Sequence, residues 1–388
     1  MLDFDHHRQT RIHFGKSALE KLPGELARYG AKVLVVTGGK SVRVSGLYDR
    51  IKGVLDAAGK KVFEVTGVTP NPRVTKVREG IGICKKEKID LILAVGGGSA
   101  IDAAKGMAMG ALSEKDVWDF YTYKASPEAA VPLGCVLTLA ATGTEMNGNT
   151  VVSNEQTKEK QGFGSPLLQP RFSILDPRLT TTVPLDQTIN GCVDIMAHVF
   201  EQYFSHTPNT PLQDRMAEAI LTTVVEESRK IVKDLSDYDT RANLLWCGTM
   251  ALNDIAVGVG KAGDWATHGM EHELSALYDI PHGAGLAILF PQWMEHVLSE
   301  GTAKFEQYAV RVWGVDPSGK EGRDVAREGI RRTKEFFREI GAPTTLREVK
   351  IDDTNIPHMA RQATRFGPIG NYRKLEAKDV EAILRASL

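Results

Sequence analysis

The chain has 388 residues, of which 42% are hydrophobic and 25% charged, and its formal net charge is -1 at pH 7. This length exceeds what one hydrophobic core usually supports, so two domains are expected. The near-zero charge gives no electrostatic reason to expect nucleic acid or an acidic membrane surface as a partner.

The cysteines and the N-terminal segment indicate the compartment. The four cysteines are far apart in sequence and form no C-x-x-C pair. They therefore favour reduced thiols over disulfides or a thiolate zinc site. The N-terminal segment is charged and lacks the apolar core of a signal peptide. No apolar run approaches the ~18 residues that span a membrane, so we expect a soluble, cytoplasmic protein.

Strand and helix signals alternate along the first part of the chain. Apolar runs typical of buried strands lie at residues 32–37, 62–65, 89–95 and 131–139. Stretches typical of helices lie at residues 47–55, 77–83 and 100–109. Strands that alternate with helices at this spacing predict an α/β fold with a doubly wound, parallel, Rossmann-like sheet.

The pattern changes near residue 180. From about Pro184 onward the apolar residues recur at helical spacing, for example at Ile195, Val199 and Tyr203, and strand signals are few. We therefore expect a dinucleotide-binding α/β domain at residues 1–180. An all-helical, metal-binding catalytic domain is expected at residues 181–388.

A glycine-rich turn follows the apolar run at residues 89–95. The glycines at 96–98 and Ser99 directly precede a predicted helix. Such glycines let backbone N–H groups approach a diphosphate, and the helix N-terminus favours negative charge. Ser99 and Asp102 also have capping-box spacing, so a capped helix after a tight turn is the structural alternative. The run is not the usual G-x-G-x-x-G, but three consecutive glycines exceed what capping needs, so it predicts phosphate binding.

Two further turns carry polar residues suited to a dinucleotide. At residues 37–41, no acidic residue is present to take the ribose hydroxyl of NAD(H), and Lys40 and Arg43 follow. This favours NADP(H) over NAD(H), with a solvated loop as the alternative. A third turn offers hydroxyls for ribose or phosphate, those of Thr138, Thr142 and Thr144. Threonines near a turn are more often capping groups than ligands.

Two groups of residues in the helical part predict a metal site. Asp194 and His198 lie four residues apart on a predicted helix, so they project from one face among apolar neighbours. A buried aspartate needs a partner. His268, His272 and His282 fall within one short segment. One carboxylate and three imidazoles suit catalytic Zn²⁺ or Fe²⁺, and the spacing leaves open which two of the last three bind it.

Jointly these motifs resemble the iron-containing, or group III, alcohol dehydrogenase family, and within it the butanol dehydrogenase branch. The resemblance covers essentially the whole chain and rests on several motifs. They are Phe14-Gly15, Asn71-Pro72, GGGSAIDAAK at 96–105, ATGTEMNGNTVVSNEQTKEK at 141–160, DPRLTTTVPLDQT at 176–188, DIMAH at 194–198 and HGMEHELSALYDIPHG at 268–283. The resemblance implies a dehydroquinate synthase-like architecture and a homodimer.

The resemblance also implies roles for individual residues. The metal ligands would be Asp194, His198, His268 and His282, with His272 beside the nicotinamide. The coenzyme would contact Gly38, Gly39, Lys40, Ser41, Asn71, Gly97, Gly98, Ser99, Asp102, Thr138, Thr142, Thr144, Asn147, Lys160 and Leu179. Members that prefer NAD(H) carry Asp at the place of Gly39, which agrees with the NADP(H) interpretation. Related butanol dehydrogenases continue this loop as Gly-Gly-Ser, whereas here Lys40 intervenes.

The expected chemistry is metal-assisted hydride transfer between a nicotinamide coenzyme and a small alcohol or aldehyde. His272 is the candidate proton relay, and Asp102 is a second catalytic candidate. Trp265, Leu274 and Tyr278 give the metal residues apolar neighbours, which favours short- to medium-chain primary alcohols and aldehydes.

Three other functions compete with this interpretation. A glycerol dehydrogenase-like polyol oxidoreductase typically has fewer histidine ligands. A dehydroquinate synthase-like lyase should need a basic cluster for a phosphorylated substrate, and the sequence offers none near these residues. A non-catalytic metal-binding protein would leave the glycine-rich turns without a role.

Overall fold

A computed structural model of the chain describes residues 1–253 and 256–388. The chain divides into two compact units. The first, here the sheet unit, comprises His7–Val183 and Leu235–Leu245. The second, the helical unit, comprises Met1–His6, Pro184–Asp234 and Trp246–Leu388. The domain boundary expected at residue 180 stays a prediction.

The sheet unit is built on a six-stranded parallel sheet in the order β1-β8-β5-β4-β2-β3. Its strands are β1 (Arg11–Phe14), β2 (Lys32–Thr37), β3 (Lys61–Val65), β4 (Leu91–Gly96), β5 (Leu133–Leu137) and β8 (Phe172–Leu175). A separate antiparallel pair consists of β6 (Asn149–Asn154) and β7 (Glu159–Gly164). The helices of the unit are α1 (Leu22–Leu26), α2 (Ser41–Val44), α3 (Leu47–Ala57), α4 (Val74–Glu87), α5 (Gly98–Ala111) and α6 (Val117–Tyr121).

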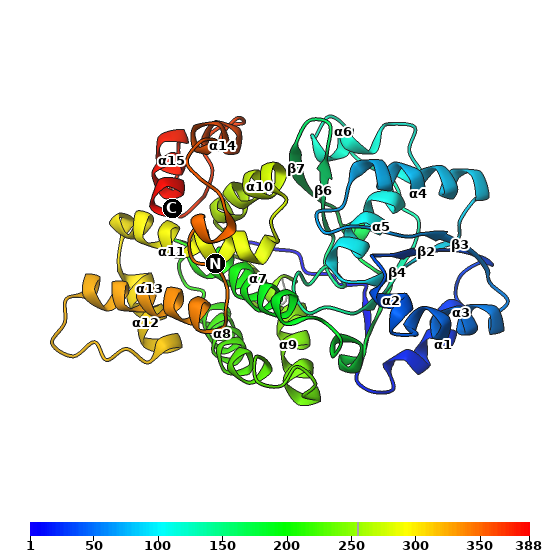
Figure 1. The fold of residues 1–388 in the computed structure, drawn as a ribbon, viewed down its shortest axis with the longest axis horizontal. Helices are drawn as coiled ribbons and strands as arrows, with labels where there is room; N and C mark the ends of the chain where they lie inside the picture. Colours follow the sequence, from blue (N-terminus) through cyan, green and yellow to red (C-terminus); the bar gives the residue numbers. More distant parts are fainter. Residues whose placement is uncertain (254–255) are drawn as a thin grey trace. The chain divides into compact units, whose positions relative to one another are not determined.

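Helices cover both faces of this sheet (Figure 1), because the strands bury both sets of alternating side chains. Leu34 and Val36 of β2 belong to the core shared with α4 and α5. Val33 and Val35 belong to the core shared with α1 and α3. This explains why β2 has a continuous apolar run, and the predicted parallel α/β fold is confirmed.

Small residues allow α4 and α5 to pack closely. A Cβ added to Gly80 of α4 would lie 2.3 Å from the sulfur of Met107, and one on Gly110 of α5 would lie 2.3 Å from Ile81. Nearly every side chain of α5 is buried. The predicted capping box is wrong, because α5 begins at Gly98 and its N-cap residue is Gly97, so Ser99 lies inside the first turn.

The helical unit contains the long helices that the 3.6-residue periodicity predicted. Its helices are α7 (Leu185–Tyr203), α8 (Pro211–Ile231), α10 (Ala266–Tyr278), α11 (His282–Val297), α12 (Ala303–Trp313), α13 (Gly322–Glu339), α14 (Ile356–Ala363) and α15 (Ala377–Ala386). Helix α9 (Tyr238–Ala251) begins in the sheet unit and ends in the helical unit. No helix among the described residues combines the length and apolarity needed to cross a bilayer.

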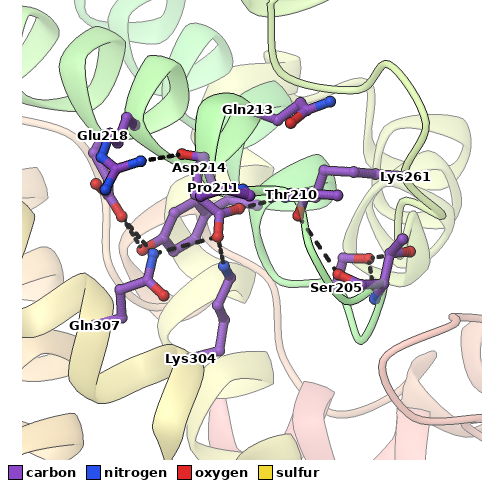
Figure 2. A network of polar contacts seen from close by, with 12 residues as sticks. Ser205, Thr210, Pro211, Gln213, Asp214, Glu218, Lys261, Lys304 and Gln307 are labelled. Carbon is purple, nitrogen blue, oxygen red and sulfur yellow. Dashed lines mark hydrogen bonds and ion pairs between the residues drawn. The ribbon is translucent and has the colours of Figure 1, made fainter. Parts of the chain in front are cut away.

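A network of charged and polar side chains joins α8 and α12 to the segment that precedes α10 (Figure 2). Asp214 of α8 accepts hydrogen bonds from Lys261, at 2.8 Å, and from Lys304 of α12. One turn later, Glu218 accepts a hydrogen bond from Gln307 at 2.6 Å. The Lys261 side chain is only 1% exposed, so this ion pair is largely shielded from solvent and fixes the chain that leads into α10.

Candidate metal centre and coenzyme site

The three polar turns expected from the sequence meet at the carboxyl edge of the sheet. Strands β2, β4 and β5 are parallel neighbours, and the segments at residues 38–41, at 97–99 and after Leu137 each follow the end of one of them. In the sheet, β3 lies on one side of β2 and the next strand in sequence, β4, lies on the other side of β2, so the direction of strand addition reverses there. In open α/β sheets, ligands bind in the crevice at such a topological switch point. The structure therefore brings the predicted coenzyme turns together at a suitable place.

The glycines at the start of α5 also have a packing reason. A Cβ added to Gly98 would lie 2.9 Å from the Thr142 hydroxyl, and one on Gly97 would lie 3.2 Å from Leu139. The glycines thus let the segment at 139–142 approach the helix N-terminus. A backbone without side chains at a helix N-terminus is also what close approach of a phosphate to N–H groups requires.

Asp102 and Thr144 are buried and bond to each other. The Thr144 hydroxyl donates to Asp102 Oδ1 at 2.7 Å, and the backbone N–H of Val151 donates to Oδ2 at 3.0 Å. Burial raises the pKa of Asp102, although the ammonium of Lys105 opposes this shift. Both carboxylate oxygens therefore support the chain around residues 144–151. The predicted catalytic and coenzyme roles of Asp102 stay predictions.

Lys105 is a buried cation that sequence reasoning missed. Its ammonium donates to the Thr144 hydroxyl, to the carbonyl and side-chain oxygens of Asn147, and to the carbonyl of Asn149, all between 2.7 and 3.1 Å. Burial lowers the pKa of Lys105 to about 8. One side chain thus fixes the 142–149 loop, which carries three of the expected coenzyme contacts. A lone lysine among the alanines and glycines of 100–110 was the available signal.

The turn at residues 37–41 has an acidic neighbour that the sequence did not indicate. Arg43 donates to Glu64 of β3 at 2.5 Å and lies over the ring of Tyr48, 3.8 Å from its centroid. The tyrosine hydroxyl also donates to Glu64. Glu64 comes from the strand beside β2, so a search at the end of β2 alone overlooks it. Lys40 is exposed at the N-cap of α2.

The remaining coenzyme candidates belong to the same unit. Asn71 is buried and adopts a left-handed backbone conformation, with φ of 52°. Lys160 lies on β7 and is buried. Leu179 lies in a short 3₁₀ helix and packs against the core shared with α1 and α3. Their contacts with a coenzyme stay predictions.

The predicted metal ligands converge within the helical unit. Asp194 and His198 lie on α7, His268 lies on α10, and His282 is the first residue of α11. Ligand atoms of Asp194, His268 and His282 all lie within 4.8 Å of one another. The His198 Nε2 atom lies 3.8 Å from Asp194 Oδ1, and the His198 ring stacks on His268 at 5.0 Å.

The chemistry of this cluster fits a divalent cation. Burial holds the pKa of His198 well below its usual value, and His268 and His282 add to the effect. A neutral imidazole is the form that binds metal. One carboxylate with three imidazoles matches a catalytic Zn²⁺ or Fe²⁺ site that keeps a position open.

Two buried glutamates orient the imidazoles, and both were missed in the sequence. His268 Nδ1 pairs with Glu201 Oε1 at 2.7 Å, and His282 Nδ1 pairs with Glu271. Because Nδ1 faces a glutamate, Nε2 is the nitrogen that each ring would present to a cation, as in a carboxylate–histidine–metal site. Glu201 also accepts the backbone N–H of His268 at 3.0 Å and that of Trp265 at 2.6 Å. Burial raises the pKa of Glu201 to about 8.

His272 lies beside this cluster. It follows His268 by one turn of α10, it is partly buried, and its ring centroid is 5.9 Å from that of His282. The sequence left open which two of these three histidines would bind a metal. The structure brings His268 and His282 to Asp194.

Comparison with known proteins identifies the family. Residues 9–177 match the family described as iron-containing alcohol dehydrogenase, and residues 188–388 match the C-terminal part of the Fe-containing alcohol dehydrogenase family. The chain belongs to the iron-containing alcohol dehydrogenase family. Membership confirms the resemblance drawn from the motifs and makes the protein a nicotinamide-dependent alcohol dehydrogenase that uses a divalent metal.

Relatives within the family match all or nearly all of the chain. A probable NADH-dependent butanol dehydrogenase of Bacillus subtilis is 50% identical, with 100% of both chains covered. The NADPH-dependent aldehyde reductase of Escherichia coli is 38% identical over 95% of this chain and 94% of its own. The crystal structure of an NADH-dependent butanol dehydrogenase from Thermotoga maritima superposes with a TM-score of 0.96 at 40% identity, covering 100% of this chain and 99% of that one.

Proposed function

We propose that the protein is an NADP(H)-linked, metal-dependent alcohol dehydrogenase that acts on short- to medium-chain primary alcohols and their aldehydes. The observation that carries this proposal is the cluster of Asp194, His268 and His282, whose donor atoms lie within 4.8 Å of one another. The butanol dehydrogenases and the aldehyde reductase among the relatives support this substrate class.

In this proposal Asp194, His198, His268 and His282 hold the cation. When bound, the cation supplies Lewis-acid polarisation of a carbonyl group and the nicotinamide supplies a hydride. The same four ligands suit Fe²⁺ and Zn²⁺.

The remaining residues position groups and move a proton. Glu201 and Glu271 fix the rings of His268 and His282 through their Nδ1 atoms. His272, which is partly buried and whose ring centroid lies 5.9 Å from that of His282, is the proposed proton relay to the oxygen of the alcohol product. We keep Asp102 as a second candidate that acts from the coenzyme side.

The first test measures butanal-dependent oxidation of NADPH by chelated protein, before and after Fe²⁺ or Zn²⁺ is added back. Activity that returns with metal supports the proposal and identifies the better cation. If no metal restores turnover to protein that still binds NADPH, the proposed function fails, and the lyase alternative or a very different carbonyl substrate gains support.

A variant separates the proton relay from metal binding. Replacement of a general acid–base residue typically lowers turnover by about 10²- to 10⁴-fold. We expect His272→Ala to lose turnover within this range while its metal content stays at the wild-type level. Loss of the metal in His272→Ala would instead make this residue a ligand.

Coenzyme preference is tested by comparing kcat/KM for NADPH and NADH. Because Arg43 is already engaged by Glu64, we propose that exposed Lys40 contributes most to binding a 2′-phosphate. Lys40→Ala should lower the NADPH to NADH ratio by about tenfold, as expected for a charged hydrogen bond. A wild-type preference for NADH would refute this part and leave the metal chemistry untouched.

We also propose a homodimer in the cytoplasm. Light scattering on the purified protein and fractionation of cells test these two statements. A monomer, or protein in the membrane fraction, would contradict them.

A further inference from the structure

Trp265 adopts a backbone conformation that large side chains rarely take. Its φ is 66° and its ψ is 6°, in the left-handed region, directly before α10. Glycine reaches this region without strain, whereas a bulky residue there is an outlier that the surrounding structure must hold in place. An indole at a strained position of this kind indicates that the ring itself has a use.

The surrounding residues hold both the backbone and the ring. The Trp265 N–H donates to the buried Glu201 carboxylate at 2.6 Å, and the Trp265 carbonyl accepts the N–H of Gly269 at 3.1 Å. A Cβ added to Gly263 would lie 2.5 Å from the indole nitrogen, so only glycine leaves room for the ring there. Two hydrogen bonds therefore hold the backbone of Trp265, and Gly263 leaves the space that the indole occupies.

The indole lies against a predicted metal ligand and is not part of the core. Its ring meets that of His268 edge-on, with centroids 5.3 Å apart and planes at 65°. The residue is 38% exposed, although a large apolar side chain is normally more buried. An apolar surface thus borders the cluster on the side of His268.

We infer that Trp265 is a specificity-determining residue, whose indole forms the apolar wall that binds the alkyl chain of the substrate. This inference rests on the proposed function and deepens it. It explains why the strained backbone carries a tryptophan and not a glycine, and it favours unbranched alkyl groups over polyols as ligands.

The test uses alkylamides, which have the shape of an aldehyde but do not react. Binding of acetamide and butyramide to the metal-loaded full-length protein is measured by calorimetry. Butyramide has two more methylene groups than acetamide, and their burial should make it bind the wild type about 15-fold more tightly than acetamide does. This factor is the butyramide-to-acetamide affinity ratio. We expect this ratio to fall to about threefold or less in Trp265→Ala and in Trp265→Gly. Trp265→Phe should keep most of it.

A matched control separates relief of backbone strain from loss of the wall. Tyr123 is also aromatic and left-handed, with φ of 56°, and it is 74% exposed in the sheet unit. Tyr123→Gly should leave the amide ratio at the wild-type value. Trp265→Gly should be at least as stable as Trp265→Ala, since glycine adopts the left-handed conformation without strain.

Two outcomes distinguish this inference from the proposed function. In the first outcome, metal restores aldehyde turnover, but the butyramide-to-acetamide affinity ratio in Trp265→Ala and Trp265→Gly stays within twofold of the wild-type ratio. This result would refute the role of Trp265 and leave the proposed dehydrogenase reaction intact. If no aldehyde is reduced while the ratio still depends on Trp265, the apolar wall stands and the proposed reaction is refuted.

Discussion

Replacement of Lys105 by methionine tests the support beneath the coenzyme turns. The ammonium is fully buried and its three N–H donors face four acceptor atoms of residues 144–149 within 3.1 Å, while its neighbour Asp102 is also buried. Methionine has a similar length and leaves these acceptors and the Asp102 carboxylate without their cation. Removal of one partner of a buried charge pair typically costs about 3–5 kcal/mol.

Hydrogen exchange of the amides at residues 142–151 measures this cost locally. A loss of about 3–5 kcal/mol accelerates exchange by roughly two to four orders of magnitude, if the segment opens as one unit. Lys52→Met in α3 is the control, because Lys52 forms only a partly exposed pair with Asp56. Exchange in Lys105→Met that stays within tenfold of the wild type would refute the assigned role. In the double variant Lys105→Met/Asp102→Asn, the total loss of local stability should be smaller than the sum of the losses in the two single variants.

Three further predictions concern other parts of the structure. Glu201→Ala should weaken metal affinity by about 10- to 100-fold in a chelator competition assay, and unchanged affinity would contradict its orienting role. Burial raises the pKa of Asp214, but hydrogen bonds from Lys261 and Lys304 outweigh it and leave the pKa below its usual 3.8. The ion pairs of Asp214 with Lys261 and Lys304 therefore stabilise the protein above about pH 3.8, and this stabilisation is lost as the pH falls through the lowered pKa. Lys261→Met should melt at a lower temperature than the wild type at neutral pH, and this difference should shrink on acidification. Gly134→Ala would place a Cβ 2.2 Å from the Phe172 ring. We expect urea unfolding to show that the free energy of unfolding is lower by about 1–3 kcal/mol. An unchanged free energy of unfolding would mean that the ring can move aside.

The sequence was sufficient for the fold because apolar periodicity is a local signal. The run at residues 32–37 became β2 with the expected bounds, and the helical spacing of Ile195 and Val199 became α7. Short elements such as β1 and the β6–β7 pair were harder to predict. Their sequences are partly polar and their pairing depends on segments far along the chain.

The site was predictable to the extent that its residues share a helix. Asp194 and His198 are four residues apart, and a four-residue spacing places two side chains on one face. Glu201 and Glu64 could not be found in this way. Glu201 pairs with His268 of another helix, and Glu64 of β3 pairs with Arg43 of α2, so only the packed structure brings each pair together.

The hydrogen bonds that Glu201 forms with His268 and Trp265 have a consequence for protein engineering. One carboxylate holds the ring of His268 and also the backbone of Trp265. A substitution at residue 265 that shifts this backbone to admit a larger substrate would therefore also turn the histidine. With the metal site and the Trp265 wall as proposed, substrate range and metal retention are coupled, so libraries built at residue 265 should be screened for metal content as well as for turnover.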